Sequence, residues 1–281
     1  MISYCIACYR PRYAVRLIAE LVRKTSAQYE ILVWLNTQEE DFEAHLRGLA
    51  DAGVPLKIVG ATPGNIGMAA YPDLFAASRY EMVVQIDDDV VMVSPGIAEI
   101  ADRIFRRFPN VCMLTADVWQ DEYTTGARPE MSHYRLYDAE LGLYDGPIDG
   151  WFAVYRRSSL RHISVSRAQY LPLGGLFRQE LKRRRLEGLL CMGFRVFHVI
   201  GPQYASCFGM LDFEIEKYRR LGRNEIVRWY ESARAGLPDA AELEQRVAAI
   251  EKQLSVSPGV GSGGFEGRAL IDYWSGRPDS N

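Results

Sequence analysis

The N-terminal third of the chain alternates between two patterns of apolar positions. Short runs of consecutive apolar residues, as expected for strands buried on both faces, occur at residues 2–8, 30–35, 56–59 and 82–86. After the first run, Val15, Ile18 and Val22 recur at helical spacing, and similar segments predict helices over roughly 39–51 and through Leu74. Strands that alternate with helices predict βαβ units and a mostly parallel sheet.

The rest of the chain is less regular. Its pattern predicts, in order, a helix over 97–108, a strand over 111–116, a polar tyrosine-rich stretch over 119–148, a strand over 151–155, a basic helix over 179–190, a strand over 194–200 and an amphipathic helix through Leu243 and Leu254. We expect one domain over residues 1–255, followed by a flexible, glycine-rich tail over 256–281.

Right-handed crossovers place the loops that follow parallel strands along one edge of the sheet. The loops concerned are 8–12, 36–38, 60–67 and 87–89. Ligands of such sheets bind at this edge, beyond the carboxyl ends of the strands. The sequence therefore predicts a binding site built from these four loops.

Three consecutive aspartates, Asp87, Asp88 and Asp89, follow the fourth apolar run directly. Adjacent carboxylates repel one another unless a cation compensates them, and Mg²⁺ and Mn²⁺ prefer oxygen ligands. Alternate residues of an extended segment point the same way, so Asp87 and Asp89 are expected to share a face. The triplet alone is equally compatible with a solvated acidic turn.

Composition excludes some classes of function. The chain has 281 residues, of which 48% are hydrophobic and 25% charged, and its net charge of −3 argues against nucleic acid as a partner. We find no apolar run that could span a membrane and no signal-peptide pattern at the N-terminus, which favours a cytoplasmic protein. Its five scattered cysteines favour reduced thiols.

Five segments occur in an order that is typical of one large group of enzymes. They are residues 2–11, Glu30–Asn36, the Asn-x-Gly loop at 65–70, Gln85–Val90 with the Asp-x-Asp pattern, and Gly150–Arg157. Through them, residues 2–200 resemble the nucleotide-sugar glycosyltransferases with the GT-A fold, most of all the inverting family 2. The resemblance implies an α/β, Rossmann-like sheet flanked by helices, with a donor half over 1–95 and an acceptor half over 96–255.

The resemblance also implies a reaction and its partners. A hexosyl group would pass from a nucleoside diphosphate sugar to a hydroxyl on a glycan, a lipid-linked molecule or a small molecule, with Mn²⁺ or Mg²⁺ as cofactor. The donor-binding positions that it implies are Ala7, Cys8, Tyr9, Arg10, Asn36, Asn65, Gly67, Asp87 and Asp88. The metal ligands would be Asp89, Asp87 and His198, although a single histidine in an apolar run is also typical of a core residue.

Two carboxylates compete for the role of catalytic base. Glu180 matches the acidic motif at the start of the family's acceptor helix, but Leu181 follows it where the family often has Asp. Asp149, just before Gly150, is the alternative. We expect Trp151 to bind the acceptor, together with tyrosines of 119–148, and the tail to act as a lid.

Two other functions remain open at this point. A nucleotidyltransferase uses a related fold, but it would normally carry a glycine-rich signature after the first strand, where Tyr9–Arg12 contains no glycine. A non-catalytic module that binds nucleotide-sugar or glycan is compatible with Asn36 and Leu181. The sugar, the base and the acceptor cannot be read from these residues.

Overall fold

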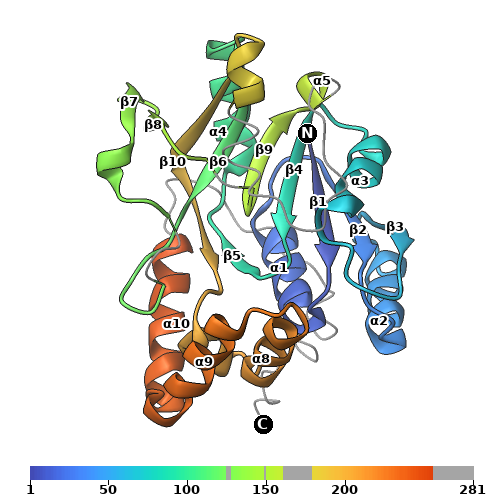
Figure 1. Ribbon diagram of the computed structural model, residues 1–281. Coiled ribbons are helices and arrows are strands. Elements are labelled where there is room, and N and C mark those ends of the chain that lie inside the picture. The colour runs from blue at the N-terminus through green and yellow to red at the C-terminus, as the bar shows by residue number, and fades with distance from the viewer. Residues whose placement is uncertain (125–127, 149, 161–178, 256–281) are drawn as a thin grey trace.

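The computed structural model describes residues 1–124, 128–148, 150–160 and 179–255. In this part of the chain a ten-stranded sheet forms the centre of the molecule, and it runs through both halves of the sequence (Figure 1). The strand order is β3 (Leu56–Ala61), β2 (Tyr29–Leu35), β1 (Ile2–Cys8), β4 (Met82–Asp87), β9 (Phe152–Arg156), β6 (Val111–Val118), β10 (Glu187–His198), β8 (Leu143–Asp145) and β7 (Arg135–Asp138). The short strand β5 (Val90–Val93) pairs with β10.

Most of the sheet is parallel, as the sequence predicts. Strands β3, β2, β1 and β4 pair in parallel, and so do β6 and β10. Strand β9 is inserted between β4 and β6 and is antiparallel to both. Two antiparallel steps restore the original direction, so the carboxyl ends of β1, β4, β6 and β10 all lie on one edge of the sheet.

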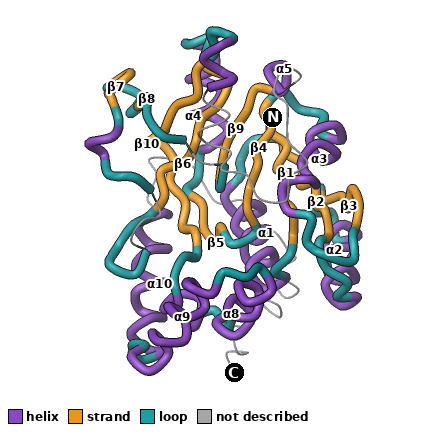
Figure 2. The backbone as a smooth tube through the Cα atoms, in the orientation of Figure 1, coloured by secondary structure: helices purple, strands orange, loops and turns teal. Residues whose placement is uncertain are grey.

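Helices cover both faces of the sheet (Figure 2). The described helices are α1 (Pro11–Lys24), α2 (Glu40–Asp51), α3 (Tyr71–Ala77), α4 (Ile97–Arg107), α5 (Arg157–Leu160), α7 (Pro202–Cys207), α8 (Leu211–Arg220), α9 (Asn224–Ala233) and α10 (Ala240–Ser255). One core cluster joins α1, α2 and α4 to the sheet, and a second joins α3 to the opposite face. None of the described helices is both long and apolar enough to cross a membrane.

The helices after β10 gather at the carboxyl edge of the sheet. In Figure 1, α8 and α9 lie below the lower ends of β1, β4 and β5. Separate apolar clusters hold these helices: one packs α7 and α10 against β5 and β10, and a smaller one joins α7, α8 and α9. The region where a ligand is expected therefore has a helical layer beside it.

One predicted element is wrong. The basic segment 179–190 does not form a single helix, because only residues 179–183 are helical and β10 begins at Glu187. Arg185 has a φ of 57°, a left-handed conformation that ends the helix. The next residues, Leu189 and Leu190, are buried beside β6, and their burial as a strand outweighs the helical preference of the preceding lysine and arginines.

Two glycines test the packing at the edge of the sheet. A Cβ atom on Gly60 would lie 2.4 Å from the indole ring of Trp34, whereas a Cβ on Gly48, in α2, would have no neighbour within 4 Å. We expect Gly60→Ala to lower the free energy of unfolding by about 1–3 kcal/mol through overpacking. Gly48→Ala should leave it unchanged or raise it by up to about 1 kcal/mol, because alanine favours a helix. Urea unfolding of both variants measures the difference, and equal effects would contradict this packing.

Candidate active site

The acid triplet occupies a tight connection between two strands. Asp87 ends β4, and Asp88 and Asp89 form the turn into β5. The N–H of Asp87 donates to the carbonyl of Trp151 at 2.9 Å, and the N–H of Val199 donates to the carbonyl of Asp89 at 2.9 Å. Backbone hydrogen bonds therefore fix the triplet between the start of β9 and the end of β10.

The structure brings together the three residues that the sequence proposed as metal ligands. One potential ligand atom from each of Asp87, Asp89 and His198 lies within 4.8 Å of the others. His198 Nε2 lies 3.0 Å from Asp89 Oδ1, and both residues are buried. His198 reaches the triplet because β10 pairs with β5 in antiparallel register, with His198 opposite Val90.

Burial and mutual contact shift the pKa values of this cluster. Burial, followed by the charge of Asp89, raises the pKa of Asp87 to about 7. Burial opposes ionisation of Asp89 too, but Arg10 and His198 hold the pKa of that carboxyl well below its usual range. For His198, burial lowers the pKa and the Asp89 charge raises it, and the net pKa is raised. Asp89 and His198 thus shift one another's pKa in opposite directions.

Asp88 points away from this cluster toward the loop after β1. Its Oδ2 accepts the backbone N–H groups of Tyr9 at 2.5 Å and Arg10 at 2.6 Å. Its Oδ1 accepts the Nε–H of Arg10 at 2.8 Å. Asp88 therefore holds this segment, residues 8–12, in place against the end of β4. We call this segment the first turn.

The Arg10 guanidinium joins the triplet to helix α8. Arg10 Nη1 lies 2.5 Å from Asp89 Oδ2 and 3.2 Å from Glu214 Oε1, and Glu214 also pairs with Lys217. Neither Glu214 nor Lys217 was expected from the sequence to belong to the site. They belong to a helix rich in charged residues, a pattern typical of a solvent-exposed face. Nothing in the local sequence indicates that these two side chains are buried.

The predicted donor residues Asn36 and Asn65 shape the loop before α3. Asn36 is buried, and its Oδ1 accepts the hydroxyl of Thr62 at 3.1 Å and the N–H of Ile66 at 3.3 Å. Asn65 Oδ1 accepts the N–H of Gly67 at 2.8 Å. Gly67 has a φ of 53°, which a residue with a side chain rarely adopts. Both asparagines thus determine the course of this loop beside the first turn.

The first turn itself combines buried and accessible positions. Ala7 lies opposite Asp87 in the pairing of β1 with β4, and the side chain of Cys8 is fully buried. The ring of Tyr9 packs against Phe213 of α8, with ring centroids 5.4 Å apart. Cys8 can therefore offer a ligand only its backbone, while Tyr9 offers a ring.

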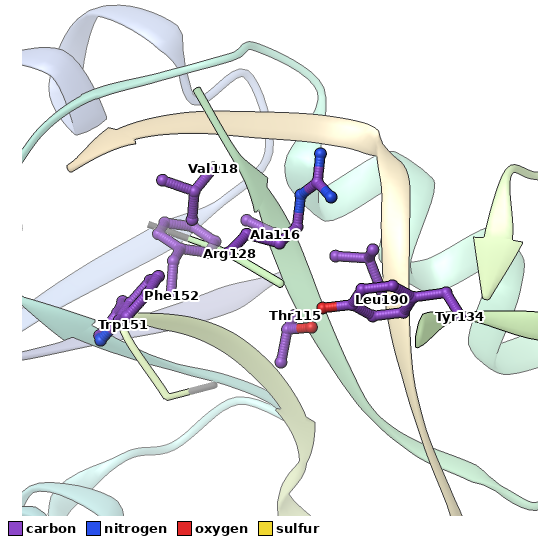
Figure 3. A pocket seen from close by; sticks show the side chains of 8 residues that line it. All are labelled: Thr115, Ala116, Val118, Arg128, Tyr134, Trp151, Phe152 and Leu190. Atoms are coloured by element: carbon purple, nitrogen blue, oxygen red, sulfur yellow. The ribbon is translucent and has the colours of Figure 1, made fainter. Parts of the chain in front are cut away.

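A crevice adjoins the metal-ligand cluster through Trp151. The indole ring packs on the imidazole of His198, with centroids 4.9 Å apart and planes inclined by 42°. Figure 3 shows Trp151 and Tyr134 at opposite ends of this crevice, which is narrow, with a cavity volume of about 20 Å³, and opens to solvent. Its remaining lining residues are Thr115, Ala116, Val118, Arg128, Phe152 and Leu190.

The tyrosines of the stretch 119–148 do not all face this crevice. Tyr134 lines it, but Tyr137 packs on Phe108 and Tyr123 packs on Tyr204. Trp151, Phe152 and Tyr134 are therefore the aromatic residues that line the crevice in the described part of the chain.

Glu180 is not brought to the cluster. Glu187, at the start of β10, pairs with Val111 at the start of β6, whereas Val118 ends β6 at the opposite edge. An eight-residue strand such as β6 spans roughly 23 Å. Glu180 precedes Glu187 in the chain, and its carboxylate is 2.6 Å from Arg184 of the same helical turn. The structure thus places Glu180 at the amino ends of the strands, far from the acid triplet.

Asp149 and the tail 256–281 lie outside the described residues. The residues that follow Asp149 are close to the triplet: the carbonyl of Gly150 accepts Gln85 Nε2 at 2.9 Å, and the carbonyl of Trp151 accepts the N–H of Asp87. The chain at 150–151 is therefore anchored on β4 beside the cluster.

The residues of the cluster fit a divalent cation. Two carboxylates and an imidazole are common ligands of Mn²⁺ and related ions. Within the described part of the chain, the buried His198 Nδ1 has no hydrogen-bond partner. Among the described residues, the four carboxylates of Asp87, Asp88, Asp89 and Glu214 outnumber the two permanent cations that pair with this group, Arg10 and Lys217. A doubly charged ion would balance this excess.

Comparisons with known proteins place the fold. No family model and no curated protein sequence matches the chain. The mannosyltransferase PcManGT from Pyrobaculum calidifontis, solved with GDP-Man and Mn²⁺, is 12% identical with a TM-score of 0.56, over 97% of this chain and 78% of its own. GalNAc-T7, solved with UDP, GalNAc and Mn²⁺, is 10% identical with a TM-score of 0.56, over 72% of this chain. S. aureus TarS is 13% identical with a TM-score of 0.55, over 92% of this chain.

The chain spans less than half of two of these proteins, 43% of GalNAc-T7 and 44% of TarS. At such low identity the likeness concerns the fold alone. It confirms the fold expected from the sequence: the central sheet and its flanking helices have the GT-A fold.

Proposed function

We propose that this protein is a metal-dependent glycosyltransferase, which moves a hexosyl group from a nucleoside diphosphate sugar to a hydroxyl group with inversion. The Asp87–Asp89–His198 cluster at the carboxyl edge of a GT-A sheet carries the proposal. It is supported by two structures of the same fold, one solved with GDP-Man and Mn²⁺ and one with UDP, GalNAc and Mn²⁺.

Asp87, Asp89 and His198 would hold Mn²⁺ or Mg²⁺. A bound ion supplies charge that stabilises the departing diphosphate. The protein positions the ligands in advance, because backbone hydrogen bonds fix both aspartates and Trp151 packs against His198. Such support orients a ligand ring and strengthens metal binding.

The donor nucleotide is assigned to the space between the first turn and the Asn65–Gly67 loop. The buried side chain of Asp88 accepts a backbone hydrogen bond from the first turn, and that of Asn36 accepts one from the Asn65–Gly67 loop. Each side of the site is therefore fixed by a buried polar residue. Tyr9 would offer a ring face to the base, and backbone near Gly67 can approach a ligand closely.

The acceptor is assigned to the crevice beyond Trp151. Its aromatic ends suit the apolar face of a sugar or an aglycone. An inverting reaction needs a carboxylate that takes the acceptor proton. We assign this role to Asp149 rather than Glu180, because the residues after Asp149 are anchored beside the cluster while Glu180 lies at the other edge of the sheet.

Loss of one carboxylate ligand tests the metal site. Asp89→Ala should lower Mn²⁺ affinity by about 100-fold or more, since even changes to groups that only orient metal ligands cost 10–100-fold. Asp73→Ala removes an exposed carboxylate from α3 and serves as the matched control. Titration calorimetry with Mn²⁺ on folded protein makes the comparison. Equal affinities of the two variants would exclude this metal site.

The same pair of variants also separates an enzyme from a binding module. Hydrolysis of a panel of nucleoside diphosphate sugars should depend on Mn²⁺ in the parent and in Asp73→Ala, and should be lost in Asp89→Ala. A parent that binds these donors with Mn²⁺ but never cleaves them would instead be a non-catalytic module.

The choice of base is tested by two isosteric changes. Asp149→Asn should lower sugar transfer by about 100-fold or more and leave donor affinity unchanged, as expected when general-base catalysis is removed. Glu180→Gln should keep nearly the parental rate, because its carboxylate pairs only with arginines of its own helical turn in the described chain. A strong loss in Glu180→Gln with a mild one in Asp149→Asn would reverse the assignment.

A further inference from the structure

Helix α8 presents a buried charged pair to the first turn. Glu214 and Lys217 lie one helical turn apart, and their side chains are only 6% and 12% exposed. Arg10, which Glu214 also contacts, is 13% exposed. Removing charged groups from water costs free energy that an ion pair often fails to recover. Three charges gathered at the edge of the candidate donor site therefore suggest a role besides stability.

The carboxylate of Glu214 bridges two cations, one from the first turn and one from α8. Its Oε1 lies 3.2 Å from Arg10 Nη1, and its Oε2 accepts a hydrogen bond from the Lys217 ammonium. Lys217 also lies over the ring of Tyr218, 4.2 Å from its centroid. One anion with two oxygens thus spans the gap between Arg10 and Lys217.

Glu214 differs from the other carboxylates around Arg10. Asp88 accepts two backbone N–H groups, and Asp89 belongs to the cluster with His198. The ion pairs of the Glu214 side chain among the described residues are those with Arg10 and Lys217. It is therefore the carboxylate that another anion could replace without breaking the first turn or the metal-ligand cluster.

A diphosphate has the chemistry to take this place. Its oxygens are acceptors that bridge neighbouring cations, and guanidinium and ammonium groups are the usual partners of phosphate. The position is suitable as well, because Arg10 Nη1 lies 2.5 Å from Asp89 of the candidate metal site. Phe213, next to Glu214, packs on Tyr9, the residue assigned to the base.

We propose that Arg10 and Lys217 together bind the diphosphate of the nucleotide donor, and that Glu214 occupies their site until the diphosphate displaces it. This inference rests on the proposed function. It assigns part of the donor site to α8, which is distant in the sequence from the motifs in the first ninety residues. It also predicts opposite effects for two residues one turn apart, whereas a purely structural link between α8 and the first turn predicts loss in both.

The test compares four variants in the full-length protein with Mn²⁺ present. Lys217→Met removes the cation, Lys217→Arg keeps it, and Glu214→Gln removes the competing charge. Arg220→Met is the control, since Arg220 is 70% exposed on the same helix and pairs with Glu216. Titration calorimetry measures affinity for UDP, GDP, ADP and CDP and for the matching monophosphates, after thermal unfolding has confirmed that each variant folds.

Lys217→Met should weaken binding of the diphosphate by about 10-fold or more, the loss expected for a hydrogen bond to a charged group. Monophosphate affinity should change less, Lys217→Arg should recover most of the loss, and Glu214→Gln should bind the diphosphate more tightly than the parent. If Lys217→Met matches Arg220→Met, or if Glu214→Gln weakens binding, the diphosphate assignment is overturned. A parent that binds none of the four diphosphates overturns the proposed function and this inference together.

Discussion

Repulsion among the carboxylates at the end of β4 governs the architecture of this edge of the sheet. Three consecutive aspartates cannot all remain ionised and largely buried unless cationic or N–H groups compensate them. Asp88 takes backbone amides and the guanidinium of Arg10, and Asp89 takes Arg10 and His198. Burial, followed by the charge of Asp89, raises the pKa of Asp87 to about 7. The first turn supplies Arg10 to these carboxylates, and β10 supplies His198. Helix α8 joins them through Glu214, which pairs with Arg10.

The inserted strand β9 has a similar organising role. Because it runs antiparallel between β4 and β6, its start lies beside the end of β4. That placement puts Trp151 against His198 on one side and into the crevice on the other. A parallel strand in the same position would have put its start at the opposite edge, and the metal-ligand cluster and the crevice would then share no wall.

The parts of the site that could be predicted are those encoded by local pattern. Continuous apolar runs located β1 and β4. Asp87 and Asp89 do lie close together, but Asp88 and Asp89 form a turn and not the extended segment from which this was expected. The position of His198 came from the resemblance to a family, since an apolar run containing one histidine does not reveal its partner. The antiparallel pairing of β5 with β10 supplies that information, and β5 is too short to be recognised in the sequence.

Other parts depend on contacts that no local pattern records. Glu214 and Lys217 have the spacing of an ordinary solvated ion pair, and only the packing of α8 on the first turn buries them. Glu180 shows the reverse case, because the helical segment that contains it ends at Arg183 and β10 then carries the chain to the opposite edge. Charged helical segments look alike in sequence, and tertiary packing decides which of them reach a site.

The pairing of β5 with β10 also has a consequence for folding. Asp89 and His198 are distant in the chain, and they meet only after the strands on either side of the long intervening segment have paired. In an unfolded chain only the adjacent aspartates lie close together, and the set of three ligands is not assembled. A cation that binds the complete set recognises the native state alone, so its free energy of binding adds to the stability of the whole sheet. The concentration of metal would then affect both the stability of the folded protein and the rate of the proposed reaction.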